Sequence, residues 1–190
     1  MSREILLLRH GRTPGNAEYR YNGTTDESLS PEGIAALEAR RYPPTDTVYV
    51  TRLRRTRETA AILFPGARQI TVPGLREMDF GVFEGRNYTE MEHDADYRAW
   101  VDSGCLGKIP GGECRAEFLR RIGASFRALL RADRSDRITV VAHGGTLMAV
   151  CLLFVDPSRD YFDWRPYNGG GFLLRTTPDP QKLELAEEYA

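Results

Sequence analysis

Residues 5–13 read ILLLRHGRT and residues 138–146 read ITVVAHGGT, and this repeated pattern decides the fold. In each stretch an apolar run ends at a histidine that is followed by glycine. Short runs of Ile, Val and Leu that stop at glycine are typical of buried strands in a parallel sheet. Because open α/β folds place their ligands at the carboxyl ends of such strands, we expect His10 and His143 to face one cleft.

The side chains beside His10 indicate what this cleft binds. Arg9 and Arg12 flank the histidine, and a guanidinium fork matches the oxygens of phosphate or carboxylate. An imidazole between two arginines suits an anion better than a metal ion. The alternative is that each histidine ends its strand and bonds only to nearby backbone. The same arrangement at both strands favours the functional interpretation.

Length and composition narrow the classes of protein to consider. The 190 residues are enough for one domain with a proper core, and we expect a single domain over residues 1–190. A net charge of −1 gives no overall field for binding nucleic acid or a membrane surface. The three cysteines form no CxxC pair, and no apolar run approaches the length of a membrane span. We therefore expect a cytoplasmic protein with no nucleic-acid or membrane partner, and the sequence leaves a homodimer open.

Strand and helix patterns alternate along the chain, which predicts an α/β fold: a three-layer α/β/α sandwich with a mostly parallel central sheet. A helix is expected to begin at Ser30, Pro31 and Glu32 and to stop at the two prolines 43 and 44. Residues 14–29 and 103–112 are expected to be loops, and residues 86–114 a substrate-side insertion. Further strands are expected at 47–50, 69–72, 172–175 and 183–186, and further helices at 53–64, 88–101, 115–131 and 145–154.

Two more segments complete a set of motifs. Residues 51–60 read TRLRRTRETA, and residues 75–85 read LREMDFGVFEG. With them, the chain resembles the histidine phosphatase superfamily, the phosphoglycerate mutase-like proteins, over residues 5 to 150. The matching positions are Arg9, His10, Gly11, Thr13, Asn16, Thr51, Leu53, Arg55, Thr59, Ala60, Leu75, Glu77, Phe80, Gly81, Glu84, Gly85 and His143. The departures from the family pattern are Thr51 for serine, Arg52 for an acidic residue, Thr56 for alanine, Phe83 for tryptophan and Cys114 for serine.

The resemblance implies a role for each site residue. His10 resembles a nucleophile that becomes phosphorylated, and Glu77 resembles the acid and base of the reaction. The implied oxyanion clamp consists of Arg9, Arg55 and a protonated His143, with Asn16 as a further donor. The amino end of the helix at Gly144 would also bind phosphate. Only its spacing from Phe80 and Gly81 favours Glu77 over Asp79. The implied chemistry needs neither a metal ion nor a cofactor.

These roles predict a metal-independent phosphomonoesterase that acts on a small phosphorylated metabolite through a phosphohistidine. Residues 75–85 and 110–113 resemble those of α-ribazole phosphatases and broad-specificity phosphatases, so α-ribazole phosphate is a candidate substrate. Three alternatives stay open: a cofactor-dependent phosphoglycerate mutase-type phosphotransferase, a catalytically silent phosphate-binding module, and a metal-dependent hydrolase. The last would use His10, His143, Glu77 and Asp79 as ligands.

Overall fold

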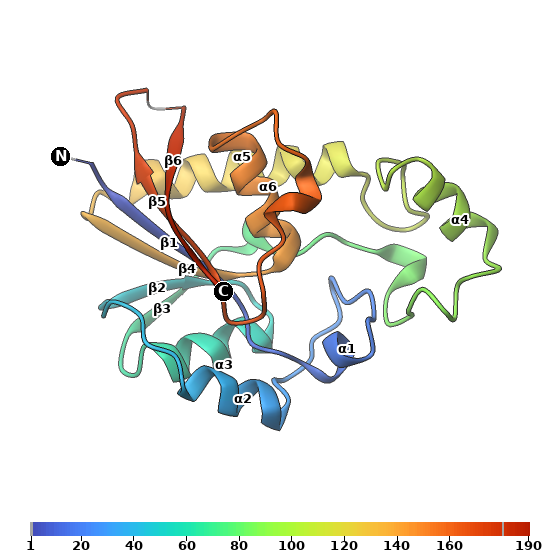
Figure 1. The fold of residues 1–190 in the computed structure, drawn as a ribbon, viewed down its shortest axis with the longest axis horizontal. Helices are drawn as coiled ribbons and strands as arrows, with labels where there is room; N and C mark the ends of the chain where they lie inside the picture. The colour runs from blue at the N-terminus through green and yellow to red at the C-terminus, as the bar shows by residue number, and fades with distance from the viewer. Residues whose placement is uncertain (1, 180) are drawn as a thin grey trace.

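A six-stranded sheet forms the centre of the computed structural model, which describes residues 2–179 and 181–190 (Figure 1). The strand order is β3-β2-β4-β1-β5-β6. Strands β1 to β4 pair in parallel, and β5 and β6 join antiparallel at one side, which confirms the mostly parallel sheet. The strands are β1 (Glu4–Arg9), β2 (Thr47–Val50), β3 (Arg68–Thr71), β4 (Arg137–Ala142), β5 (Gly171–Thr176) and β6 (Leu183–Tyr189).

Helices cover both faces of the sheet, as the three-layer prediction requires (Figure 1). Helices α2 (Pro31–Glu38) and α3 (Arg54–Leu63) lie on one face, and α5 (Arg115–Ala132) and α6 (Gly144–Phe154) lie on the other. Successive side chains of a strand point to opposite faces. Accordingly Ile5 and Leu7 of β1 belong to the core under α5 and α6, whereas Leu6 and Leu8 belong to the core under α3.

Local signals explain where two of these helices begin. The Ser30 hydroxyl accepts a hydrogen bond from the Gly33 amide, and Pro31 occupies the first turn of α2, as expected. Helix α6 begins at Gly144, one residue earlier than predicted, directly after His143. Within the described residues, no helix is both long and apolar enough to cross a membrane.

Two expectations about local structure are wrong. The predicted loop 14–29 contains a short helix, α1 (Pro14–Ala17), which the Thr13 side chain caps. The predicted helix 88–101 is reduced to α4 (Ala95–Asp102). Its start is fixed because the Asp94 carboxylate accepts hydrogen bonds from the amides of Asp96 and Tyr97, which is the geometry of an N-cap. The described residues also form three short 3₁₀ turns: η1 (Pro73–Leu75), η2 (Gly81–Phe83) and η3 (Tyr161–Trp164).

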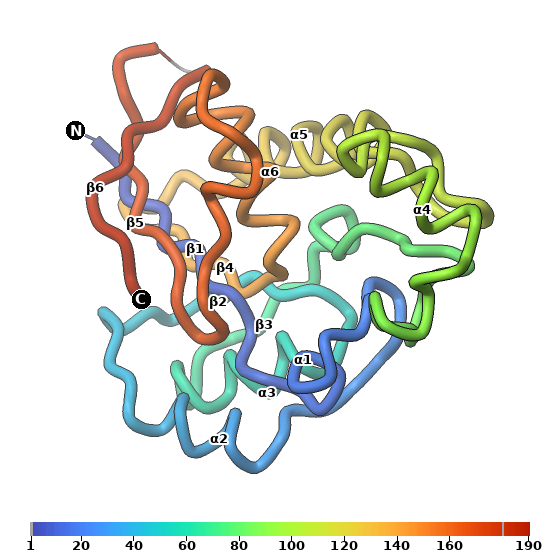
Figure 2. Tube along the Cα trace, turned by 45° about the vertical axis from the view of Figure 1, so that its right-hand side comes forward, coloured from blue at the N-terminus to red at the C-terminus, as the bar shows by residue number. Residues whose placement is uncertain are grey.

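The segment that carries α4 lies to one side of the sheet, next to the loop that follows α1 (Figures 1 and 2). An isolated bridge between Arg20 and Asn87 joins the two segments. An aromatic cluster fills the interior of this part, and Phe83 is fully buried within it. Phe83, where the resembled family usually has tryptophan, therefore packs in the core. The cluster consists of Tyr21, Phe80, Phe83, Tyr97 and Trp100.

We predict that Gly112→Ala lowers the free energy of unfolding by about 1–3 kcal/mol, the usual cost of overpacking. An added Cβ would overlap the Asp79 carbonyl oxygen and lie 2.8 Å from the Gly81 amide nitrogen, and neither backbone group can move freely. Gly107→Ala is the matched control, because its nearest neighbour is a side-chain atom, the Ser103 hydroxyl oxygen, at 3.2 Å rather than backbone. Urea unfolding, followed by tryptophan fluorescence, measures the free energy of unfolding of both variants. Equal losses of stability in Gly112→Ala and Gly107→Ala would contradict the prediction.

Candidate active site

The pairing of β1 with β4 brings the two sequence-predicted histidines together. Arg9 is aligned with Ala142 in this register, so His10 and His143 are the next residue on each strand. The His10 amide donates to the Ala142 carbonyl at 3.0 Å, and the two imidazole centroids are 5.4 Å apart. Both side chains are buried. The parallel register therefore builds the centre of the site.

Hydrogen bonding fixes the tautomer of His10. Its Nδ1 lies 2.7 Å from the Gly11 carbonyl oxygen, which can only accept, so Nδ1 carries the proton. The lone pair is left on Nε2. Burial lowers the pKa of His10 well below 6.5, and the charges of Arg55 and Arg9 lower it further. His10 is therefore a neutral imidazole with a nucleophilic Nε2.

His143 is also neutral, which differs from the expectation. Its Nδ1 accepts a hydrogen bond from Arg55 Nε at 3.4 Å, so its Nε2 donates to the Thr51 hydroxyl at 2.9 Å. Burial lowers the pKa of His143 well below 6.5, and Arg55, His10 and Arg9 add to this effect. Burial, together with the two neighbouring guanidinium groups, thus disfavours the protonated form of His143 that the sequence predicts.

Arg55 lies in the first turn of α3 and is almost completely buried. Its Nη1 donates to the Thr25 carbonyl at 2.6 Å, and its Nη2 donates to the carbonyls of Asn22 and Gly23, each at 3.1 Å. Burial lowers the pKa of Arg55, and several carboxylates at longer range partly oppose this. No ion pair forms between Arg55 and a carboxylate among the described residues. Its positive charge is therefore available to an anion.

Arg9 is the last residue of β1, beside the amino end of α6. Its Nη1 donates to the Pro166 carbonyl at 2.9 Å, and its buried Nε has no partner among the described residues. Burial lowers the pKa of Arg9 to about 10. A Cβ added at Gly144 would lie 3.4 Å from Arg9 Nε, so the start of the helix is a direct neighbour of the guanidinium. The Gly144 amide lies at the positive end of the helix dipole.

Glu77 reaches the amino end of α6 from the loop that follows η1. Its carboxylate accepts hydrogen bonds from the amides of Gly145 and Met78, each at 2.8 Å. Burial raises the pKa of Glu77, and these two amides and the two arginines partly oppose the shift. Asp79 instead accepts a hydrogen bond from the Gly81 amide at 3.0 Å within its own turn. The structure thus brings Glu77, but not Asp79, to the histidines and arginines.

Asn16 and Arg12 occupy less central positions than the other predicted residues. Asn16 Oδ1 accepts hydrogen bonds from the Thr13 amide at 3.2 Å and from Asn168 Nδ2 at 3.1 Å, so it holds the turn around α1. Arg12 is exposed. Asn168 also donates to the His10 carbonyl at 3.1 Å. Sequence reasoning missed Asn168, because it belongs to no motif and reaches the site only through the fold.

Glu84 organises the loop that holds Arg55, a role that its motif did not reveal. Its carboxylate accepts hydrogen bonds from the amides of Gly23, Thr24 and Thr25 and from the Thr25 hydroxyl. The carbonyls of the same loop hold the Arg55 guanidinium. Glu84 therefore positions Arg55 without touching it.

The alternative of a metal site has no geometric support in the described part of the chain. No group of three or more His, Cys, Asp or Glu side chains there lies close enough to hold a metal ion. Arg9 and Arg55 lie beside the histidines instead. These residues suit an anion.

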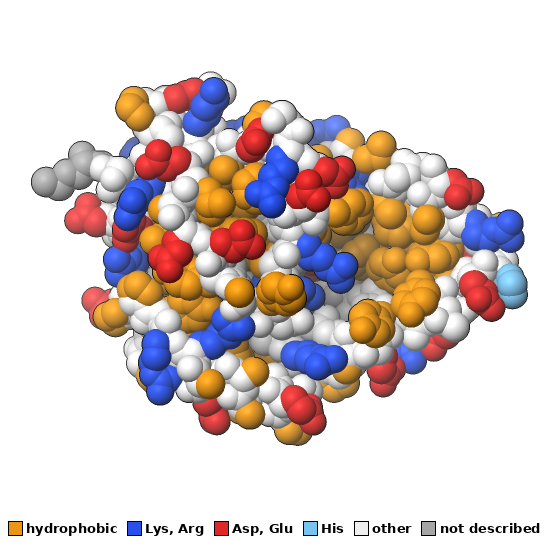
Figure 3. All heavy atoms as spheres, viewed as in Figure 1, with side chains coloured by type: hydrophobic (Ala, Val, Ile, Leu, Met, Phe, Trp, Pro, Cys, Tyr) orange, Lys and Arg blue, Asp and Glu red, His pale blue; other side chains and the backbone are white. Residues whose placement is uncertain are grey.

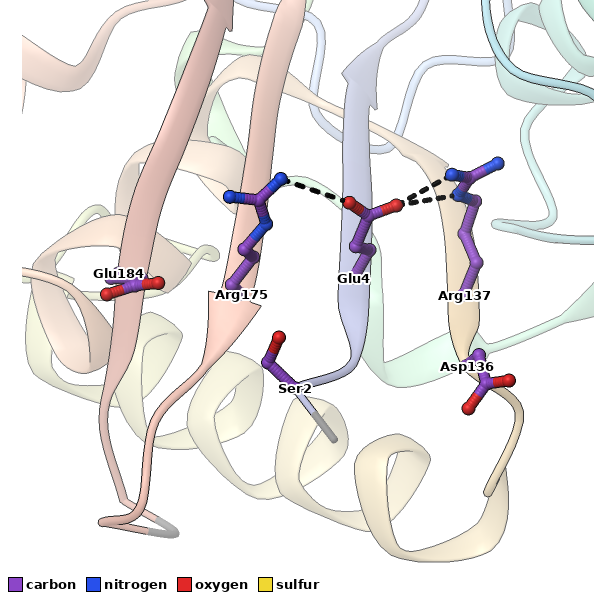
Figure 4. A pocket seen from close by; sticks show the side chains of 6 residues that line it. All are labelled: Ser2, Glu4, Asp136, Arg137, Arg175 and Glu184. Carbon is purple, nitrogen blue, oxygen red and sulfur yellow. Dashed lines mark hydrogen bonds and ion pairs between the residues drawn. The ribbon is translucent and has the colours of Figure 1, made fainter.

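A separate cavity of about 580 Å³ lies at the amino end of β1, at the opposite end of this strand from His10. Figure 4 shows Glu4 between Arg137 and Arg175, with ion-pair distances of 2.6 Å and 3.3 Å. The three side chains come from neighbouring strands, and the one carboxylate pairs with both guanidinium groups. We assign this cavity no part in the active site.

The molecular surface is hollowed between the part that carries α4 and the rest of the molecule (Figure 3). Hydrophobic side chains gather on the α4 side of this hollow, and Lys and Arg side chains lie along its opposite edge. The two sides therefore differ in chemistry.

The chain belongs to branch 1 of the histidine phosphatase superfamily, because the sequence model of that family matches residues 5–187. Among curated relatives, "Putative phosphoserine phosphatase 2" of Hydrogenobacter thermophilus is 31% identical over 80% of this chain and 78% of its own length. "Probable phosphoglycerate mutase GpmB" of Erwinia tasmaniensis is 32% identical over 95% of both chains. Family members with names of both kinds, phosphatase and mutase, are thus similar to this chain.

Solved structures agree with the fold. The phosphoglycerate mutase from Thermus thermophilus has a TM-score of 0.73 at 26% identity and covers 98% of both chains. A structure titled "putative alpha-ribazole-5'-P phosphatase" from Escherichia coli has a TM-score of 0.88, covering 99% of this chain and 96% of its own. At 23% identity, the second likeness concerns the fold alone. The phosphoglycerate mutase-like architecture is therefore confirmed.

We predict that the buried histidines make the protein less stable below about pH 6.5. The unfolded chain binds protons on His10 and His143 near the ordinary pKa of 6.5, whereas the folded chain does not until well below it. The free energy of unfolding therefore falls as the pH drops through this window, while the raised pKa of Glu77 acts in the opposite direction.

The test compares the pH dependence of the free energy of unfolding between variants. When the pH falls from about 7.5 to 5.5, the free energy of unfolding of His10→Asn should fall by about 1 kcal/mol less than that of the unsubstituted protein. This difference corresponds to the one proton that the substituted side chain no longer binds in the unfolded state. His93→Gln is the control, because the third histidine is 89% exposed. Chemical unfolding at both pH values gives the differences. A pH dependence that is the same in all three proteins would contradict the prediction.

Proposed function

We propose that this protein is a metal-independent phosphomonoesterase that acts on a small phosphorylated metabolite through a phosphohistidine on His10. The observation that carries the proposal is that the neutral imidazole of His10, with its unprotonated Nε2, lies beside the buried guanidinium groups of Arg9 and Arg55. A phosphoryl group needs a nucleophile, positive charge around its nonbridging oxygens and a proton for the leaving oxygen. The residues around His10 can supply all three.

In the first step, His10 Nε2 attacks phosphorus in line with the leaving oxygen. The Nε2–P bond forms as the P–O bond to the alcohol breaks, and protonated Glu77 gives its proton to the departing oxygen. Arg9, Arg55 and the Gly144 amide stabilise the nonbridging oxygens. Asn16 completes this set in the proposal. His143 keeps Arg55 oriented through the contact at 3.4 Å.

In the second step, the Glu77 carboxylate takes a proton from water, and the resulting hydroxide attacks the phosphohistidine. The Nε2–P bond breaks, inorganic phosphate leaves, and both His10 and Glu77 return to their starting protonation states. Burial raises the pKa of Glu77, which helps one carboxyl group serve as acid and then as base. We assign residues 86–114 to the substrate side of the cleft.

Two other functions use the same residues. A mutase would return the phosphoryl group to a bound acceptor rather than to water, and a silent module would only bind phosphate. We favour hydrolysis because the segment between Glu77 and His143 has little room for the larger insertions expected of a glycolytic mutase. The relative named as a phosphoserine phosphatase also supports hydrolysis. α-Ribazole phosphate stays a candidate substrate on the resemblance of residues 75–85 and 110–113.

The proposal predicts p-nitrophenyl phosphate hydrolysis that persists with chelator present and falls at least about 10³-fold in His10→Ala, because the nucleophile is lost. Rapid acid-free quenching with a ³²P-labelled ester should trap an alkali-stable, acid-labile adduct on the unsubstituted protein only. His93→Ala is the control and should keep full activity.

Three outcomes would count against the proposal. Activity that chelator removes and zinc restores would favour a metal-dependent hydrolase. Transfer of the label to added 3-phosphoglycerate, rather than to water, would favour a mutase. Binding of inorganic phosphate without turnover of any ester would favour the silent module.

Glu77→Gln tests the acid and base role separately. Glutamine keeps the shape of the side chain but cannot give a proton to the leaving oxygen. p-Nitrophenolate leaves easily without a proton, whereas an alkoxide does not. We expect phosphorylation of His10 by glycerol 3-phosphate to slow by about 10²–10⁴-fold and phosphorylation by p-nitrophenyl phosphate to slow much less. Single-turnover kinetics measure this step, and equal losses with both esters would contradict the assignment.

A further inference from the structure

The loop that carries Glu77 has no regular secondary structure of its own. It lies between η1 and η2, and residues 76–79 belong to no helix or strand. Backbone groups outside regular secondary structure need other hydrogen-bond partners wherever water does not reach them. The position of Glu77 therefore depends on the side chains that bind this loop.

Three carbonyls in this part of the chain accept hydrogen bonds from one side chain, Arg121 of α5. Its Nη1 donates to the carbonyls of Gly74 and Arg76, each at 2.9 Å, and its Nη2 donates to the Glu77 carbonyl at 3.1 Å. A guanidinium is planar and presents its donors in a rigid fork, so carbonyls bound to it keep fixed places relative to one another. The backbone of Glu77 is thus tied to α5.

Glu113 fixes the direction of the Arg121 side chain. Its carboxylate accepts hydrogen bonds from Arg121 Nε at 2.8 Å and from Arg121 Nη2 at 2.7 Å, which is bidentate geometry. Both side chains are largely buried, and Arg76 adds a longer contact to the same carboxylate at 3.3 Å. Burial would raise the pKa of Glu113, but hydrogen bonds from Arg121 and from the Asp79 amide lower it overall. The pair is therefore charged and held in one orientation.

Glu113 also binds the loop directly. Its carboxylate accepts a hydrogen bond from the Asp79 amide at 3.0 Å, and its own amide donates to the Asp79 carbonyl at 2.9 Å. The loop is thus bound by Arg121 up to Glu77 and by Glu113 at the second residue beyond it. Between these two anchors, the Glu77 carboxylate reaches the amino end of α6, where the Gly145 amide donates to it at 2.8 Å.

We propose that the pair of Arg121 and Glu113 positions Glu77 for proton transfer to the leaving oxygen and from water. The inference rests on the proposed phosphomonoesterase function. Proton transfer requires the carboxyl group to lie within hydrogen-bonding distance of the reacting oxygen, and a misplacement of about 1 Å can cost about 100-fold in rate. Among the described residues, neither side chain of the pair forms a hydrogen bond with His10 or His143. Arg121 and Glu113 are therefore positioning residues that act through Glu77.

Arg121→Lys tests this role. Burial and Arg55 mainly lower the pKa of His143, and the charge of Arg121 adds to this effect. Lysine keeps that charge but has three donors, too few for the three carbonyls and Glu113 together. We expect phosphorylation by glycerol 3-phosphate, whose alkoxide needs a proton, to slow by about 10- to 100-fold, and phosphorylation by p-nitrophenyl phosphate to change little. The KM of both esters should stay the same, because Arg121 contacts the loop and not the substrate. Single-turnover and steady-state kinetics give the two quantities.

Arg127→Lys is the matched control, because Arg127 lies on the same helix and packs in a similar way. Its Cζ lies 5.0 Å from the centroid of the Phe154 ring. Arg121 Cζ lies 5.2 Å from the centroid of the Phe118 ring. Among the described residues, Arg127 donates no hydrogen bond to the loop that carries Glu77. Arg127→Lys should leave the rates with both esters unchanged.

A double variant shows whether Arg121 acts through Glu77. Once Glu77→Gln has removed the proton donor, moving the loop has no proton transfer left to impair. Adding Arg121→Lys should then cause no further loss with glycerol 3-phosphate. Additive losses, or equal losses with both esters in Arg121→Lys alone, would overturn the positioning role. Glu113→Gln keeps the shape of its side chain but weakens the pair, so it should give the same pattern with smaller losses. It decides the question if Arg121→Lys does not fold.

An NMR titration separates this inference from the proposed function. Burial raises the pKa of Glu77, and the amides of Met78 and Gly145 partly oppose the shift. Displacing the loop weakens these two hydrogen bonds, so Arg121→Lys should raise the pKa of Glu77 further, whereas Arg127→Lys should not. The signal is that of ¹³C-labelled glutamate carboxyl groups, assigned by its loss in Glu77→Gln. An unchanged pKa in Arg121→Lys would overturn the inference even in an active phosphatase. If the protein hydrolyses no ester, the phosphatase proposal fails, and the titration still decides whether the pair positions Glu77.

Discussion

The register between β1 and β4 is the constraint on which the rest of the site depends. Parallel pairing of Arg9 with Ala142 puts His10 and His143 side by side, and it sets the start of α6 against Arg9. A shift by one residue would turn the alternating leucines of β1 to the wrong cores as well as separate the imidazoles. The same hydrophobic pattern that stabilises the sheet therefore fixes the geometry of the histidines.

Positive charge at the site is held by neutral backbone groups. Arg55 is oriented by three carbonyls and Arg9 by a fourth, so neither charge is cancelled by an ion pair with a carboxylate among the described residues. The consequence is electrostatic. Burial and, after it, the two guanidinium groups lower the pKa of both imidazoles, which favours the neutral His10 that nucleophilic attack requires. The cost of this arrangement is offset by Glu84, which anchors the loop whose carbonyls bind Arg55.

Sequence reasoning succeeded where the signal was local or periodic. The two histidine strands, the Ser30 cap and the choice of Glu77 over Asp79 follow from short patterns in the chain. Sequence reasoning failed where a side chain contacts a residue that is distant in the sequence. Thr51, noted in the sequence only as a motif position with threonine in place of serine, binds His143 through its hydroxyl. The lowered pKa of His143 depends on burial and on arginines brought in by other elements. Helix α4 is shorter than predicted because the Asp94 side chain caps it, which apolar spacing does not reveal.

Arg115 and Arg55 illustrate two ways in which a fold can keep a buried cation without a carboxylate. Arg55 is surrounded by carbonyl oxygens, whereas Arg115 lies on an aromatic face. Carbonyls fix all the nitrogens that they contact, but a ring face leaves the edge of the guanidinium unengaged. The Tyr161 hydroxyl donates to the Gly145 carbonyl, and the Gly145 amide donates to Glu77, so a rigid ring and packed backbone connect Arg115 to Glu77.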